Sequence, residues 1–184
     1  MSCRASNKAR WRWLCIASAL WFLWPSSPAW SWPNQYDGDI KRAVDRYWPA
    51  FPFWKAWKAQ LIAESGLRPN AVSPVGAAGL AQFMPGTWAD TVRAMGLPTG
   101  ATPFEAKYAI EAGAFYMAKR RADWRARRPE IDRHRLAQAS YNAGHGNSLA
   151  AQRACGMPTL YEPIIACLAQ ITGRHSEETI GYVA

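Results

Sequence analysis

Beyond residue 31, apolar side chains recur along the chain at spacings of three and four, and no alternating apolar and polar run exceeds a few positions. Spacings of three and four are typical of one buried helix face, whereas alternation is typical of strands. The sequence therefore predicts an all-α fold with a loop over residues 67–74. The expected helices span residues 39–47, 53–65, 76–83, 87–95, 103–124, 133–143, 149–155, 160–171 and 176–183.

The first 31 residues follow a different pattern. Four basic residues by position 12 precede an uncharged apolar run over residues 13–24, and Pro, Ser and Ala follow. This run falls short of the roughly 20 residues that span a bilayer as a helix. We therefore expect a signal peptide over residues 1–31, cleaved after Ala29 or Ser31, and a periplasmic location. An uncleaved membrane anchor is the alternative, and a lipoprotein is disfavoured because Cys15 lacks a small-residue lipobox.

The remaining residues, 32–184, are long enough for one domain with a single core. Removing the leader's four basic residues leaves 18 Lys and Arg against 13 acidic residues, an ordinary excess. The basic tract over residues 119–135 is interrupted by Asp123, Glu130 and Asp132, which favours a solvated helix face. We accordingly expect no nucleic-acid partner.

Two of the four cysteines, Cys3 and Cys15, lie in the predicted leader. Cys155 and Cys167 remain, and in an oxidising compartment they are expected to form a disulfide. The alternative is a pair of buried thiols that fill core space. His134, His145 and His175 show no metal-ligand spacing, so neither a metal nor another cofactor is expected.

Glu64 is the acidic residue that requires an explanation. It follows Trp57 and Leu61 at i+7 and i+3, so it shares one helix face with two large apolar side chains. Desolvation and the negative end of the helix dipole both raise the pKa of a carboxyl group in such a position. A raised pKa suits a general acid for glycosidic cleavage. The structural alternative is an exposed Glu64 that pairs with Arg68.

Four motifs occur in order along the chain, and the first of them contains Glu64. They are Glu64-Ser65, the segment over residues 73–87 that contains GLAQFMP, Ser140-Tyr141-Asn142-Ala143-Gly144, and the closing ETIGYV over residues 178–183. Together they resemble the catalytic domain of the soluble lytic transglycosylases, which has a goose-lysozyme-like fold. One position departs from the family pattern, because Ala81 stands where the family commonly has Met; we expect looser packing or altered sugar contacts there.

The resemblance implies a role for each matching residue. Glu64 would act as the single catalytic acid and base, and peptidoglycan glycan strands would be the substrate. The residues that bind substrate or line the cleft would be Ser73, Gln82, Met84, Tyr141, Asn142, Glu178 and Tyr182. Tyr141 would orient Glu64 or stabilise positive charge, and Ser73 would contact N-acetyl or lactyl groups. Turn formation, core packing, capping and ordinary hydrogen bonding are the structural alternatives for these side chains.

The family reaction is a lytic transglycosylation. The C6 hydroxyl of N-acetylmuramic acid attacks its own anomeric carbon and leaves a 1,6-anhydro end. Most glycosidases instead use two carboxylates, and the nearest downstream acids, Asp90 and Glu105, belong to no recognisable motif. The alternatives are a hydrolytic goose-type muramidase and a peptidoglycan-binding assembly factor of a secretion, conjugation or phage apparatus. The chain is expected to act as a monomer.

Overall fold

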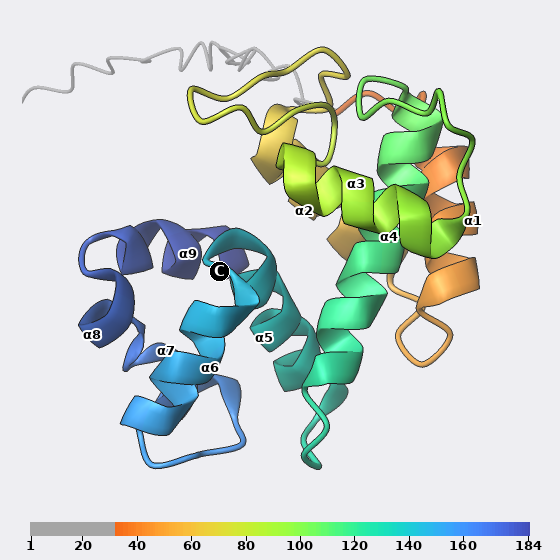
Figure 1. Cartoon of the computed structure of the whole chain (residues 1–184). Coiled ribbons are helices and arrows are strands. Elements are labelled where there is room, and N and C mark those ends of the chain that lie inside the picture. The colour runs from red at the N-terminus through yellow and green to blue at the C-terminus, as the bar shows by residue number, and fades with distance from the viewer. Residues whose placement is uncertain (1–31) are drawn as a thin grey trace, which may run out of the picture. The chain divides into compact units, whose positions relative to one another are not determined.

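The computed structural model describes residues 32–184, which fold into helices joined by short connections (Figure 1). The helices are α1 (Asp37–Tyr47), α2 (Trp54–Ser65), α3 (Pro85–Met95), α4 (Ala106–Asp123), α5 (Glu130–Asn142), α6 (His145–Ala154), α7 (Tyr161–Ile165), α8 (Leu168–Thr172) and α9 (His175–Val183). The predicted all-α class is confirmed. The predicted signal peptide and its cleavage site lie outside the described residues, in which no helix is long and apolar enough to cross a membrane.

The segment between α2 and α3 is a loop throughout, so the short helix predicted over residues 76–83 is wrong. Ala78 forms isolated antiparallel bridges with Val72 and with Phe83. Gly79 and Gln82 have positive φ angles of 77° and 45°, which a right-handed helix excludes. A Cβ atom on Gly79 would lie 1.8 Å from the carbonyl oxygen of Pro103. Because Gly79 has no side chain, its loop can contact the loop that contains Pro103. This contact accounts for a glycine at this position of the segment.

The helix predicted over residues 160–171 is divided into α7 and α8. The division falls at Ala166 and Cys167, where the Cys167 N–H bonds to the Ile164 carbonyl in a tight turn. Cys167 forms the predicted disulfide with Cys155, with the two Cα atoms 5.9 Å apart. The bridge therefore joins the end of α6 to the turn that precedes α8.

One part of the core forms where α1, α2 and α4 meet. Trp48 and Trp57 are buried there, and their indole N–H groups donate to the carbonyls of Ala114 (2.8 Å) and Ile110 (3.2 Å) on α4. Gly113 leaves room for the Trp57 ring, because a Cβ atom at that position would lie 2.4 Å from it. These contacts fix α2 against α4 and so fix the position of Glu64 at the end of α2.

A second part of the core lies among α5–α9 and contains Leu136, Ile164 and Leu168. Helix α5 contributes to both parts, since Ala137 belongs to the first and Leu136 to the second. Figure 1 shows α5 behind α6 and beside α4. Helix α5 therefore sets the separation between the loop-bearing half of the protein and the C-terminal helices.

Candidate active site

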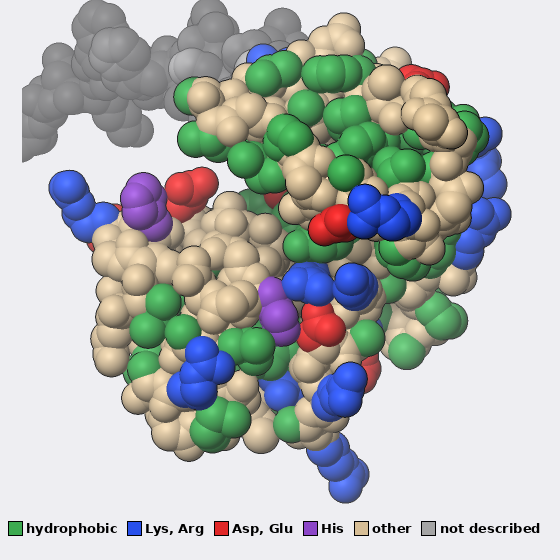
Figure 2. Space-filling model, viewed as in Figure 1, with side chains coloured by type: hydrophobic (Ala, Val, Ile, Leu, Met, Phe, Trp, Pro, Cys, Tyr) green, Lys and Arg blue, Asp and Glu red, His purple; other side chains and the backbone are tan. Residues whose placement is uncertain are grey.

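A cavity of about 540 Å³ lies between α2 with its following loop and helices α5 and α9. Figure 2 shows the surface hollowed on this side. The cavity is lined by Ala63, Glu64, Ser73, Val75, Ala77, Gln82, Met84, Tyr141, Asn142, Glu178 and Tyr182. The structure thus brings all eight predicted site residues, from four separate sequence motifs, into one cavity.

Glu64 lies in the last turn of α2, which ends at Ser65 with Gly66 in the left-handed conformation (φ 62°) as its cap. The residue as a whole is half-buried, and it lines the cavity. Burial is the largest cause that raises the pKa of Glu64, to about 7, and the negative charge of Glu178 adds to the rise. A hydrogen bond from Tyr182 opposes it. Both protonation states of Glu64 are therefore populated near neutral pH.

Tyr182 is the hydrogen-bonding partner of Glu64. Its hydroxyl donates to Glu64 Oε1 at 2.5 Å. The Arg68 side chain has another partner, because its Nε donates to the Ser65 carbonyl at 2.8 Å. The alternative in which Glu64 pairs with Arg68 is therefore wrong, and the carboxyl group faces the cavity with a neutral partner.

Tyr141 supports the cavity from α5. Its hydroxyl donates to the backbone carbonyl of Ala81 at 2.6 Å, so that proton is directed to the loop and not to Glu64. The ring lies edge-on to Trp57, Phe83 and Tyr116. Burial and the charge of Glu64 raise the pKa of Tyr141 well above its ordinary value, so the phenol stays protonated.

The loop after α2 presents three predicted residues to the cavity. Ser73 Oγ accepts a hydrogen bond from the Ala77 N–H (3.0 Å), which is the turn contact that its position before Pro74 favours. Gln82 Nε2 donates to the Gly79 carbonyl at 2.9 Å, which occupies its amide nitrogen within the loop. Met84 is 44% exposed and is thus available to a ligand.

Ala81 does not line this cavity. It is fully buried, and its Cβ would lie 3.1 Å from a Cβ atom at Gly113 of α4. Ala81, which is smaller than the Met common in the family, packs between the loop and α4. The expectation of an effect through packing agrees with this position, whereas direct contact of Ala81 with a sugar does not.

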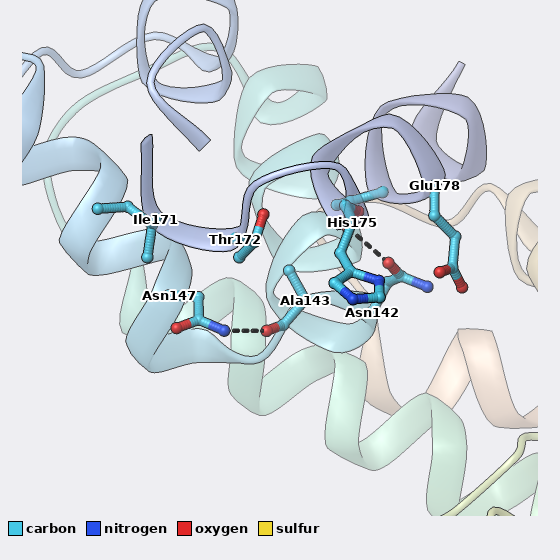
Figure 3. Close-up of a pocket in the computed structure, with 8 residues that line it drawn as sticks. Asn142, Ala143, Asn147, Ile171, Thr172, His175 and Glu178 are labelled. Atoms are coloured by element: carbon cyan, nitrogen blue, oxygen red, sulfur yellow. Dashed lines mark hydrogen bonds between the residues drawn. The ribbon is translucent and has the colours of Figure 1, made fainter. Parts of the chain in front are cut away.

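The cavity adjoins a second one of about 390 Å³, and the two share Asn142 and Glu178 (Figure 3). Asn142 Oδ1 accepts a 2.6 Å hydrogen bond from Thr179, which links the end of α5 to α9. Asn147 and His175 line the extension and were not predicted. His175 could have been predicted from the sequence, because it lies three positions before Glu178 and so shares one face of the helix with that predicted residue.

A second carboxyl group is present in the cavity, that of Glu178, a residue of the closing motif that was predicted to line the cleft. Glu178 is exposed on α9 and lines the same space as Glu64. Asp90 lines a separate cavity with Lys119, and Glu105 accepts hydrogen bonds from Thr102. Glu178 is therefore the acid that a two-carboxylate mechanism would use.

The basic tract over residues 119–135 is only partly solvated. Arg121, Arg128 and His134 are buried, so the expectation of a solvated face is wrong for these positions. Arg121 pairs with Glu130 at 2.7 Å, and Arg133 pairs with the same carboxylate at 3.0 Å. The charges of Arg121 and Arg133 are therefore paired with Glu130 where α4 meets α5. Among residues 32–184, no three His, Cys, Asp or Glu side chains cluster as metal ligands would.

These features define a lysozyme-like helical domain whose cleft contains a carboxyl group with a raised pKa. The Transglycosylase SLT domain family matches residues 55–157, more than half of the chain, and the chain belongs to this family. It is 31% identical over 115 residues to membrane-bound lytic murein transglycosylase F of Alcanivorax borkumensis, a match that covers 60% of this chain and 23% of that protein.

Two solved structures share the fold. The 70 kDa soluble lytic transglycosylase Slt70 of Escherichia coli superposes with a TM-score of 0.61 at 25% identity, over 83% of this chain and 23% of that one. An inactive mutant of the lytic transglycosylase Slt of Pseudomonas aeruginosa gives 0.64 at 24% identity, over 83% and 24%. The chain thus spans about a quarter of the length of each of these relatives.

Proposed function

We propose that this chain cleaves the β-1,4 bond between N-acetylmuramic acid and N-acetylglucosamine in peptidoglycan and leaves 1,6-anhydromuramoyl ends. The observation that carries the proposal is Glu64. Its pKa of about 7 lets one carboxyl group act first as an acid and then as a base. Family membership supports the reaction class.

In the first step, protonated Glu64 donates its proton to the glycosidic oxygen, and the bond from that oxygen to the anomeric carbon breaks. The N-acetylglucosamine side leaves as an alcohol, and positive charge develops on the muramoyl ring. Glu64 becomes a carboxylate, which the Tyr182 hydroxyl stabilises through its hydrogen bond.

In the second step, the Glu64 carboxylate accepts the proton of the C6 hydroxyl while that oxygen bonds to the anomeric carbon. The 1,6-anhydro ring closes, and Glu64 is again protonated for the next cycle. The proton gained equals the proton lost, so the proposed reaction requires neither water nor a cofactor.

The other cavity residues bind the glycan in this proposal. Ser73 and Gln82 offer polar contacts for N-acetyl and lactyl groups, and Met84 offers an apolar surface for a sugar face. Asn142 and Glu178 stand where the cavity continues into its extension, so they would meet sugars further along the strand. Tyr141 holds the loop in place through the backbone carbonyl of Ala81.

Glu178 supports a second candidate, a hydrolytic muramidase. As an exposed carboxylate in the same cavity, it could activate a water molecule opposite Glu64. Products from purified sacculi separate the candidates by mass spectrometry. Anhydro ends support transglycosylation, reducing ends support hydrolysis, and binding without release supports an assembly factor; Glu64→Gln is the control that should release nothing.

The proposal includes a periplasmic location, where peptidoglycan strands are accessible and the Cys155–Cys167 bridge is stable. A monomer suffices, since residues from this one chain line the cavity. Association with an envelope-spanning secretion, conjugation or phage machine would add a docking role to catalysis. Fractionation of cells that express the tagged full chain tests the location.

A further inference from the structure

Tyr182 separates the active-site cavity from another cavity of about 290 Å³ behind it. Tyr182 lines both. The walls of the rear cavity come from the segment before α2, from α2 itself, from α5 and from the end of α9. They include the aromatic residues Phe51 and Phe53 and the polar residues Gln60, His134 and Gln138.

Two buried side chains that line this rear cavity have polar atoms without a hydrogen-bond partner among the described residues. Gln60 is 2% exposed, and both its Nε2 and its Oε1 are unpartnered. His134 is equally buried, and its Nε2 is unpartnered. An unsatisfied buried polar group costs about 1–3 kcal/mol, so each such group requires an explanation.

The chemistry of the two groups is complementary. His134 Nδ1 lies 3.2 Å from Nη1 of Arg121, and a guanidinium group only donates, so Nδ1 accepts and Nε2 carries the proton. Burial, and then the charge of Arg121, lower the pKa of His134 to about 3, so the ring is neutral. His134 therefore offers an N–H donor to the cavity into which Gln60 offers a carbonyl acceptor.

The amide nitrogen of Gln60 has a suitable acceptor on the other side. Gln60 precedes Glu64 by four residues, so the two lie on one face of α2. The Tyr182 hydroxyl gives its proton to Glu64, which leaves its oxygen free to accept. Burial and the charge of Glu64 raise the pKa of Tyr182, and the Gln60 amide lowers it, as a donor to the phenol oxygen would.

We propose that Gln60 is a positioning residue whose amide N–H donates to the Tyr182 hydroxyl and whose carbonyl accepts from His134, directly or through one water. This chain of hydrogen bonds from His134 through Gln60 to Tyr182 is called the relay below. It keeps the Tyr182 hydroxyl directed at Glu64 and polarises the phenol, so that the Tyr182 hydroxyl stabilises the Glu64 carboxylate better. Its effect on turnover depends on the proposed function. Its effect on the titration of Glu64 does not.

Several ionisable groups surround this relay and are left unchanged by the test. Glu178 and Tyr182 face Glu64 from α9, and Tyr141 faces it from α5. His134 and Arg135 face the rear cavity from α5. A change in the titration of Glu64 after substitution of Gln60 alone is therefore assigned to the amide.

The test is the substitution Gln60→Met, which keeps side-chain length and removes both hydrogen-bonding atoms. We expect the pKa of Glu64, followed by carboxyl-carbon NMR in the full chain, to rise by about half a unit. The loss of the amide makes Tyr182 a weaker donor and so disfavours the carboxylate. Gln60→Leu should do the same, and Gln138→Met, a glutamine of the same cavity on α5, is the matched control that should not.

A purely structural role for Gln60 is separated by a double-mutant cycle. In a Tyr182→Phe background, Gln60→Met should no longer move the pKa of Glu64, because the amide acts through the missing hydroxyl. An equal shift in both backgrounds, or no shift in either, overturns the proposal. If the protein cleaves peptidoglycan, the alkaline limb of its pH profile should move with the pKa; an inactive protein would overturn the proposed function, while the NMR titration would still decide the relay.

Discussion

The hydroxyl of Tyr182 is hydrogen-bonded to the carboxyl group of Glu64, although 118 positions separate them in the sequence. Glu64 ends a helix that is fixed by the Trp57 packing on α4, whereas Tyr182 packs against the cluster of C-terminal helices. Helix α5 contributes to both clusters. The protonation of Glu64 therefore depends on how two halves of the protein are held together across α5.

Replacing Glu64 by Gln should abolish glycan cleavage, because the amide keeps the shape of the side chain but has no transferable proton. Release of soluble muropeptides from sacculi measures this. Glu177→Gln, a neighbour of Glu178 on α9 outside the cavity, is the matched control and should cleave at the rate of the unmodified chain. Turnover above a few per cent in the Glu64 variant would contradict the assignment.

The same substitution should change stability in a pH-dependent way. Because the folded pKa of Glu64 is raised from 4.5 to about 7, the native state binds its proton more tightly than the unfolded chain does. The free energy of unfolding therefore falls as pH rises through this window, by at most roughly 3 kcal/mol. Denaturant unfolding should show Glu64→Gln more stable than the unmodified chain at pH 8 and nearly equal at pH 4. An equal difference at both values would show that burial does not shift this group.

Tyr182→Phe and Tyr141→Phe should have different effects. The first removes the hydrogen bond that lowers the pKa of Glu64, so the alkaline limb of the pH profile should move upward and the rate should fall. The second leaves the Ala81 carbonyl without its donor, so we expect a loss of about 1–3 kcal/mol of stability and little movement of the limb. The pH profile and thermal unfolding of both variants check this. Identical profile shifts would show that Tyr141 also acts on Glu64.

The disulfide should contribute to stability without taking part in the reaction. It closes a span of 12 positions, for which about 3 kcal/mol is expected. The double substitution of Cys155 and Cys167 by Ser should lower Tm by several degrees, at roughly 2–4 °C per kcal/mol for a chain of this size. Calorimetry measures the change, and cleavage at low temperature should persist. An unchanged Tm would show that the bridge adds no stability.

Gly79 should be far less tolerant of Ala than Gly76, although both have positive φ. Ala at Gly76 meets no atom within 4 Å and adds only backbone strain of about 1–2 kcal/mol. Ala at Gly79 would also collide with the Pro103 carbonyl, so the loop that carries Gln82 must move. Unfolding free energies of the two variants test this. Equal losses of unfolding free energy would show that the loop moves away from Pro103 without a cost in stability.

The helix boundaries show how far local pattern reaches. Periodicity located the helix that bears Glu64 and its end at Gly66, because amphipathic spacing and a C-terminal glycine act within a few residues. It misassigned residues 76–83, because a glycine that admits a distant carbonyl and a glycine within a helix are identical in sequence. The contact between Gly79 and Pro103 is what distinguishes them.

The sequence by itself determined the all-α class and the Glu64 helix, since helical periodicity is a property of neighbouring positions. Its resemblance to the lytic transglycosylases supplied the set of eight residues that meet in the cavity. The tertiary structure decided which partner each residue has: Tyr182 and not Arg68 for Glu64, and the Ala81 carbonyl for Tyr141. It also decided that Arg121 and His134 are buried. Partner choice and burial depend on how α2, α5 and α9 pack, and that packing sums many weak long-range contacts that no local pattern records.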